Sequence, residues 1–144
     1  MNSFNQKILI VDDIEDNRFT LERRLSKSGY TAISQADCGK RALELVKQES
    51  FDLILLDLMM PDISGLDVLK ILKADPKNRG IPVVMVTAAD EIETTAECIS
   101  NGAEDYITKP INATLLKARV SACLEKKRFR DSEEHYLSKV EADK

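Results

Sequence analysis

Short aliphatic runs alternate with amphipathic stretches over roughly the first 110 residues of the chain. The aliphatic runs predict five β-strands, at residues 8–11, 30–34, 53–56, 83–86 and 106–107. The stretches between them predict four helices, one through Phe19, Leu21 and Leu25 and three more at 39–48, 65–74 and 92–100. The run at 53–56 is apolar at consecutive positions, which is typical of a parallel strand covered on both faces.

Strands that alternate with helices predict a parallel, doubly wound sheet, because parallel strands are joined by right-handed helical crossovers. Five such units in about 120 residues favour an α/β, flavodoxin-like fold, a five-stranded sheet with strand order 2-1-3-4-5. Gly29 and Gly102 follow helical patterns, where a left-handed C-cap is expected. The Lys109-Pro110 pair adds a candidate cis peptide bond.

The last predicted helix is unusually long. From Asn112, a candidate N-cap, it extends without Gly or Pro to about residue 142, which at 1.5 Å per residue is roughly 45 Å. Residues 125–144 hold six basic and six acidic side chains, so the net charge belongs to residues 1–124. The apolar residues of this segment form a ragged stripe: Phe129, Tyr136, Leu137 and Val140. We therefore expect one domain at 1–124 and an extended C-terminal helix that is either a solvated tail or a connector or dimerisation helix.

Composition narrows the class of protein. The chain has 144 residues, 43% of them hydrophobic, which suits a single buried core. Its net charge of −4 argues against binding of nucleic acid, whose phosphates attract basic surfaces. No apolar run or signal-like segment indicates a membrane, so we expect a cytoplasmic protein. Three widely spaced cysteines and one histidine argue against disulfides and structural zinc.

Several polar side chains fall at the carboxyl ends of the predicted strands, where ligands bind in doubly wound sheets. Asp12 and Asp13 end the first strand and Asp57 the third. Thr87 ends the fourth, and Lys109 follows the fifth. Strand order 2-1-3 places the first and third strands side by side and so brings three carboxylates together. Like charges this close cannot all stay ionised and unpaired.

The three carboxylates have two ways to relieve their repulsion. One carboxyl can take up a proton, or the group can bind a hard divalent cation, for which Mg²⁺ and Mn²⁺ are the candidates. A metal beside a carboxylate, a lysine and a hydroxyl favours phosphoryl transfer, with Asp57 as the nucleophile. Asp12 and Asp13 would hold the metal, while Lys109 and Thr87 would contact phosphoryl oxygens. Taken singly, each aspartate could equally be a turn or helix-cap residue.

The segments ILIVDD, LILLDLMMPDISG, VVMVTA and YITKP match, in order and spacing, those of a known family. Over residues 7–124 the chain resembles the response-regulator receivers, the CheY-like domains of two-component signalling. The resemblance implies that Asp57 accepts a phosphoryl group from a histidine kinase or a histidine phosphotransfer protein. It also implies Mg²⁺ bound by Asp13, Asp57 and the main-chain carbonyl of Met59, with Asp12 mainly reaching metal-bound water.

The resemblance further implies a switch pair, Thr87 and Tyr106. Thr87 would move toward the phosphate and the Tyr106 ring inward, remodelling the surface formed by the fourth helix, the fifth strand and the last helix. A phosphate adds about −1.5 to −2 charge, which is enough to bias two conformations. The alternative is that Tyr106 only packs at the sheet edge. A homodimer through this surface or through the last helix is a further expectation.

The positions two beyond Asp57 and two beyond Thr87 are Met59 and Ala89, and neither side chain can act as a base. We therefore expect slow autodephosphorylation and a signalling protein rather than an enzyme. The segment EKKRFRDSEE, at 125–134, resembles helical connectors that lead from receivers into output modules. We expect residues 125–144 to be a connector to an output module absent from this chain.

Three alternative functions remain open at this point. A haloacid-dehalogenase phosphatase also uses an Asp nucleophile and Mg²⁺, but it needs a second acid where this chain has Met59. A flavodoxin needs a Ser/Thr/Gly phosphate loop where this chain has Asp12 and Asp13. A scaffold that works without phosphorylation would not require the intact set of Asp57, Lys109 and the acid pair.

Overall fold

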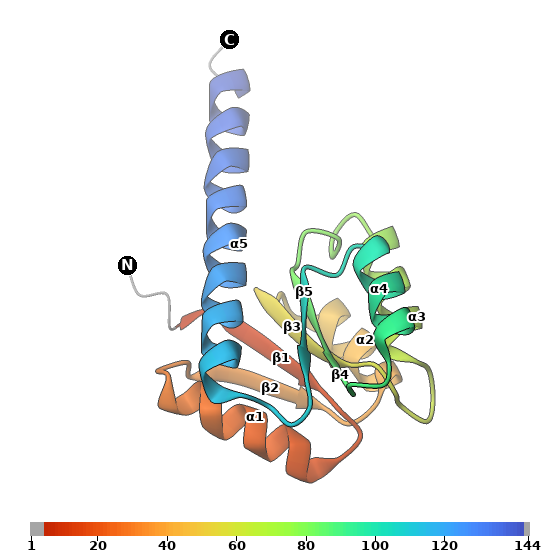
Figure 1. The fold of residues 1–144 in the computed structure, drawn as a ribbon. Helices are drawn as coiled ribbons and strands as arrows, with labels where there is room; N and C mark the ends of the chain where they lie inside the picture. Colours follow the sequence, from red (N-terminus) through yellow and green to blue (C-terminus); the bar gives the residue numbers. More distant parts are fainter. Residues whose placement is uncertain (1–4, 143–144) are drawn as a thin grey trace.

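The computed structural model describes the backbone of residues 5–142 and the side chains as far as Tyr136. Strand and helix alternate throughout this part of the chain (Figure 1). The elements are β1 (Lys7–Val11), α1 (Glu15–Lys27), β2 (Ala32–Ala36), α2 (Gly39–Gln48), β3 (Leu53–Asp57), α3 (Gly65–Ala74), β4 (Val83–Thr87), α4 (Ile92–Ser100), β5 (Asp105–Thr108) and α5 (Ala113–Ala142).

The five strands form one parallel sheet in the order β2-β1-β3-β4-β5, which confirms the predicted topology. Gly29 and Gly102 have positive φ angles of 102° and 107°, as predicted for their helix-terminating turns. The Lys109-Pro110 peptide bond is cis. The second strand begins two residues later than predicted, because the main-chain N–H of Tyr30 donates to Leu25 O and so belongs to the turn that ends α1.

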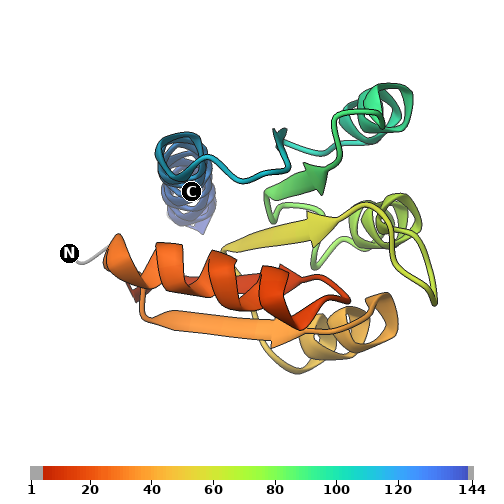
Figure 2. The same cartoon turned by 60° about the horizontal axis from the view of Figure 1, so that its bottom comes forward.

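Helices cover both faces of the sheet (Figure 2). Helices α2, α3 and α4 pack on one face, and α1 and the first part of α5 pack on the other. Successive side chains of a strand point to opposite faces. Ile54 and Leu56 therefore join the first core, while Leu53 and Leu55 join the second. This arrangement explains why β3 is apolar at consecutive positions: it is buried on both sides.

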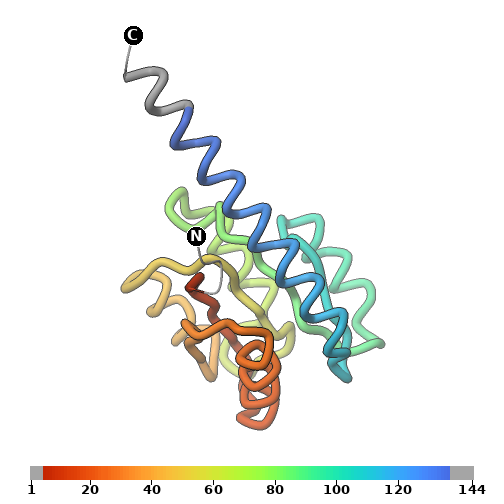
Figure 3. Tube along the Cα trace, turned by 90° about the vertical axis from the view of Figure 1, so that its left-hand side faces the viewer, coloured from red at the N-terminus to blue at the C-terminus, as the bar shows by residue number. Residues whose placement is uncertain are grey.

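Helix α5 continues well past the sheet (Figure 3). Its first turns are held by the buried side chains of Leu116, Val120, Cys123 and Leu124. Farther along, Phe129 and Tyr136 are 70% and 66% exposed. The predicted stripe also included Leu137 and Val140, whose side chains lie outside the described residues. Within the described part, no helix is both long and apolar enough to span a membrane.

Ion pairs fasten the next turns of α5 to the loops at the amino-terminal edge of the sheet. Glu104, in the loop before β5, accepts from Lys126 Nζ at 3.2 Å and from Arg130 Nη2 at 3.0 Å. Lys127 Nζ lies 3.7 Å from an oxygen of Asp52, which precedes β3. The direction of α5 is thus set by apolar packing first and then by charge.

Gly65 sits where α3 begins against the end of β3. Its N–H donates to Leu58 O at 2.8 Å. A Cβ at this position would overlap the main-chain oxygen of Asp57 and crowd the Cα of Leu58. Because these are backbone atoms, they cannot move aside as a flexible side chain could. Gly65 therefore fixes the backbone from which Asp57 projects.

We expect Gly65→Ala to lower the free energy of unfolding by about 3 kcal/mol, the upper end of the cost of overpacking a well-packed site. Gly80→Ala is the matched control, because a Cβ at Gly80 meets no atom within 4 Å. Urea denaturation of both variants measures the difference. Equal stability of the two variants would contradict the close approach at Gly65.

Candidate functional site

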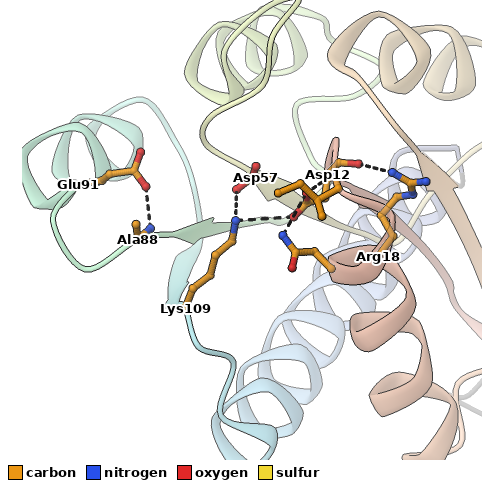
Figure 4. Close-up of polar contacts among 8 residues, drawn as sticks. Asp12, Arg18, Asp57, Ala88, Glu91 and Lys109 are labelled. Atoms are coloured by element: carbon orange, nitrogen blue, oxygen red, sulfur yellow. Dashed lines mark hydrogen bonds and ion pairs between the residues drawn. The ribbon is translucent and has the colours of Figure 1, made fainter.

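The polar residues predicted at the strand ends lie at the carboxyl edge of the sheet, and Figure 4 shows three of them, Asp12, Asp57 and Lys109. Asp12 and Asp13 follow β1, and Asp57 and Thr87 are the last residues of β3 and β4. The three aspartates each offer a carboxylate oxygen within 4.8 Å of the other two. Adjacent strands with fixed register produce this proximity, since Val11 is the β1 partner of Leu56, next to Asp57.

Lys109 brings a positive charge to the three acids. Its Nζ donates to Asp57 Oδ1 at 3.0 Å and lies 3.8 Å from Asp12 Oδ2. Partial burial acts to lower the pKa of Lys109, but the hydrogen bond and charge of Asp57, helped by Asp12, outweigh it and raise that pKa. Lys109 is therefore a fixed ammonium group beside the acidic cluster.

Asp57 is only 4% exposed, and burial raises its pKa from an ordinary 3.8 to about 6. The hydrogen bond from Lys109 opposes this shift, whereas the negative charges of Asp12 and Asp13 add to it. The positive charge of Lys109 thus does not fully offset the cost of burying the ionised Asp57 carboxylate. A further cation or a bound proton would stabilise it.

Asp12 uses its two carboxylate oxygens differently. Oδ1 accepts from the N–H of Ile14 at 2.9 Å and from Asn17 Nδ2 at 3.4 Å, which closes the turn into α1. The Asp12 main-chain oxygen accepts from Arg18 Nη1 at 2.8 Å. Oδ2 is buried and has no hydrogen-bond partner among the described residues. A role for Asp12 as a turn or helix-cap residue therefore explains the contacts of Oδ1 but not the burial of Oδ2.

The donor set fits a hard divalent cation. Three carboxylates meet without a histidine or a cysteine among them, and Mg²⁺ and Mn²⁺ prefer oxygen ligands of this kind. Oδ2 of Asp12 is the strongest sign, because it is buried and accepts no hydrogen bond among the described residues, and the Lys109 ammonium that compensates its charge is 3.8 Å away.

Met59 lies in the loop that follows β3 and is 64% exposed. This loop is tied to α2, since Asp62 accepts from the N–H groups of Gly39 at 3.1 Å and Lys40 at 2.8 Å. These bonds, the one from Lys40 foremost, lower the pKa of Asp62 to about 2. At its other end, the Ser64 hydroxyl accepts from the N–H of Asp67 and caps α3. The main chain at Met59 is thus held between two anchored helix starts.

Thr87 and Tyr106 line one hollow between α4 and β5, with a volume of about 330 Å³. Thr87 is buried, whereas Tyr106 is 41% exposed at the mouth. Arg119 of α5 covers the Tyr106 ring, its Cζ 5.8 Å from the ring centroid, and its Nη1 bonds Asp105 at 2.6 Å. A cation over an aromatic face is attractive, so Arg119 helps to hold the ring in its present position. No local sequence pattern indicates this role for Arg119.

Comparison with known proteins agrees with the geometry. The family model of the response regulator receiver domain matches residues 8–121. The chain belongs to this family. The receiver is 44% identical over 114 residues to the response regulator PleD of Caulobacter vibrioides, covering 79% of this chain and 25% of PleD. It thus spans about a quarter of the length of that relative.

Other relatives match along almost their whole length. Chemotaxis protein CheY-3 of Vibrio cholerae is 36% identical over 122 residues, which is 85% of this receiver and 94% of CheY-3. The crystal structure of a putative response regulator from Chloroflexus aurantiacus superposes with a TM-score of 0.80 at 30% identity, covering 84% of this chain and 98% of that one. Family membership sets aside the flavodoxin and haloacid-dehalogenase alternatives.

The raised pKa of Asp57 predicts how the stability of the receiver depends on pH. A carboxyl whose pKa rises on folding to about 6 favours folding while protonated, and this contribution is lost as pH rises from 3.8 through 6. In EDTA at pH 7.5, Asp57→Asn should therefore be about 1–2 kcal/mol more stable than wild type, after allowance for solvent screening. The advantage should shrink as pH falls toward 4.5. Chemical denaturation across this range measures it, and a constant difference would contradict the assignment.

Proposed function

We propose that this receiver accepts a phosphoryl group on Asp57 from the phospho-His of a histidine kinase or a histidine phosphotransfer protein, and so controls an output or partner. The observation that carries the proposal is the Asp57 carboxylate itself. It is buried, 3.0 Å from the ammonium of Lys109, and crowded by Asp12 and Asp13 at the sheet edge where α/β folds bind ligands.

In the proposed transfer, a carboxylate oxygen of Asp57 forms a bond to phosphorus while the P–N bond to the donor imidazole breaks. The nitrogen keeps the electron pair and takes a proton from solvent. Lys109 would neutralise charge on one phosphoryl oxygen, and the Thr87 hydroxyl would donate to another. The proposal thus gives each polar residue at this edge one task.

The proposed cofactor is Mg²⁺, with Mn²⁺ as a substitute. Asp13, Asp57 and the main-chain carbonyl of Met59 would hold it, with Asp12 acting through a water molecule. When bound, the ion supplies positive charge beside the phosphoryl oxygens. The anchored loop around Met59 and the buried Oδ2 of Asp12 support this set.

Switching is proposed to use Thr87 and Tyr106. Thr87 would turn toward the new phosphate, and the Tyr106 ring would enter the hollow behind it. The 330 Å³ volume of this hollow and the exposure of Tyr106 support such a movement. The surface of α4, β5 and α5 would then change shape. Because Met59 and Ala89 offer no side-chain base, we propose slow loss of the phosphate and a signalling rather than an enzymatic role.

Intact mass spectrometry after incubation with Mg²⁺ and acetyl phosphate tests the acceptor. Wild type should gain one phosphate, and Asp57→Asn should gain none, because the amide is not a nucleophile for phosphorus. Asp67→Asn is the matched control, since Asp67 lies in the first turn of α3 and is not one of the clustered aspartates, and it should be labelled like wild type. Labelling that persists in Asp57→Asn, or that does not require Mg²⁺, would refute the proposed site.

Residues 125–144 are proposed to be a helical connector that also pairs with a second copy. The support is a different set of exposed side chains on α5, which recur every seven residues and share Phe129 and Tyr136 with the stripe predicted from the sequence. This second stripe consists of Leu115, Ala122, Phe129 and Tyr136. A seven-residue period is typical of helices that pair along their length. The receiver domain proper would then end near residue 124, where the buried side chains of α5 end.

Light scattering coupled to size exclusion tests the pairing. The phosphorylated chain should have the mass of a dimer, and Phe129→Glu/Tyr136→Glu should remain monomeric because charge replaces the apolar contact. Glu133→Lys/Glu134→Lys, on the same helix but off the stripe, is the control and should still dimerise. Equal particle masses for wild type and the stripe variant would contradict the proposal.

A further inference from the structure

The loop between β4 and α4 closes on itself through Glu91. Its carboxylate oxygen Oε1 accepts from the main-chain N–H of Ala88 at 2.7 Å, and its own N–H donates to Ala88 O at 3.1 Å. Figure 4 shows this contact beside Lys109 and Asp57, on the α4 side of the site. An anionic group of the protein therefore already holds a main-chain donor at the rim of the acidic cluster.

Strand geometry shows which way this donor points. Val86 O accepts from the N–H of Leu58 on the β3 side, and Thr87 O accepts from the N–H of Lys109 on the β5 side. Ala88 directly follows the last residue of β4, and because main-chain polar groups of an extended strand alternate between its two neighbours, continued alternation would place the Ala88 N–H on the β3 side. Strand β3 has already ended at Asp57, before the level of Ala88 is reached. The Glu91 carboxylate therefore accepts the hydrogen bond that a neighbouring strand would otherwise accept.

We propose that the Glu91 carboxylate occupies a hydrogen-bond position meant for the phosphoryl group. Glu91 accepts from the Ala88 N–H until the phosphoryl group on Asp57 takes over this hydrogen bond and displaces the Glu91 carboxylate. This inference rests on the proposed function of Asp57. Once displaced, Glu91 no longer closes the loop, and the start of α4 is released. The displaced residue is a positioning residue: it acts through the loop and not on the reacting atoms.

Charge favours this exchange. The site already contains the carboxylates of Asp12, Asp13 and Asp57, and the negative charge of Glu91 is among those that raise the pKa of Lys109. A phosphoryl group adds about −1.5 to −2 charge to the same edge. Glu91 is able to leave, since it lies outside the cluster of three aspartates, on a loop, and is only partly buried.

Release of Glu91 would reach the switch surface directly. Glu91 immediately precedes α4, and its main-chain oxygen accepts from both the N–H and the hydroxyl of Thr95. Thr95 and Ile92 line the hollow that Tyr106 would enter. A change in the loop therefore changes the wall of the hollow, which gives the phosphate a second connection to Tyr106 besides Thr87.

The test compares Glu91→Gln and Glu91→Ala with wild type, using beryllofluoride in Mg²⁺ buffer as the phosphoryl mimic. Removing the charged competitor should tighten beryllofluoride binding about tenfold, the change expected when a charge-assisted hydrogen bond becomes a neutral one. Glu93→Gln removes the same charge from an exposed site on α4 and should stay within about twofold of wild type. Thermal unfolding checks that each variant is folded, and Glu91→Gln keeps an acceptor for the loop.

The Ala88 amide proton gives an independent readout by NMR. Without beryllofluoride it should resonate downfield in wild type and move upfield in Glu91→Gln, and with beryllofluoride the two should converge. Unchanged affinity and an unchanged Ala88 signal in Glu91→Gln, with normal binding to wild type, would overturn this inference alone. Failure of wild type to bind beryllofluoride would overturn the phosphoacceptor proposal and this inference with it.

Discussion

Mutual repulsion among Asp12, Asp13 and Asp57 is the constraint on which the site depends. The parallel pairing of β1 with β3 holds these carboxylates together, and Lys109 is the cation that the described residues place within 4 Å of them. Burial raises the pKa of Asp57, and the charges of Asp12 and Asp13 raise it further, so Lys109 alone does not fully compensate the three acids. In the proposed function, a bound cation would relieve this imbalance and so stabilise the folded receiver.

The carboxylates stay close because packing and hydrogen bonds hold the strands and loops that carry them in place. Strand β3 is buried on both faces, with Leu55 in one core and Leu56 in the other. Gly65 lets α3 start against the backbone of Asp57, and Asp62 anchors the following loop to α2. Close-packed interiors transmit strain instead of absorbing it. The apolar core thus offsets the electrostatic cost of the site.

Hydrophobic periodicity predicted the sheet order, because alternating strands and helices allow few topologies. The rule that ligands bind at the carboxyl ends of strands then predicted which side chains meet there. The predicted start of β2 was wrong. Tyr30 has a side chain that favours strands, but its N–H donates to Leu25 O in the turn that ends α1. The contacts of Asp62 and Arg119 depend on tertiary packing across distant segments, so local pattern carries no sign of them. Glu91 bonds a residue only three positions away, and an acid at a helix start is a signal that could have indicated it.

Within the proposed function, the weakness of the contacts around β5 matters as much as their position. Arg119 joins Asp105 to α5, and Lys126 and Arg130 join Glu104 to the same helix two turns later. Ion pairs that remain partly exposed, as these do, contribute on the order of 1 kcal/mol each. A two-state element that must respond to a single phosphate requires states separated by a few kcal/mol, because a ligand shifts populations only by its difference in affinity. These weak ties can change in response to a single phosphate, while Ile107 keeps β5 joined to α5 through the buried core that it shares with Leu116 and Val120.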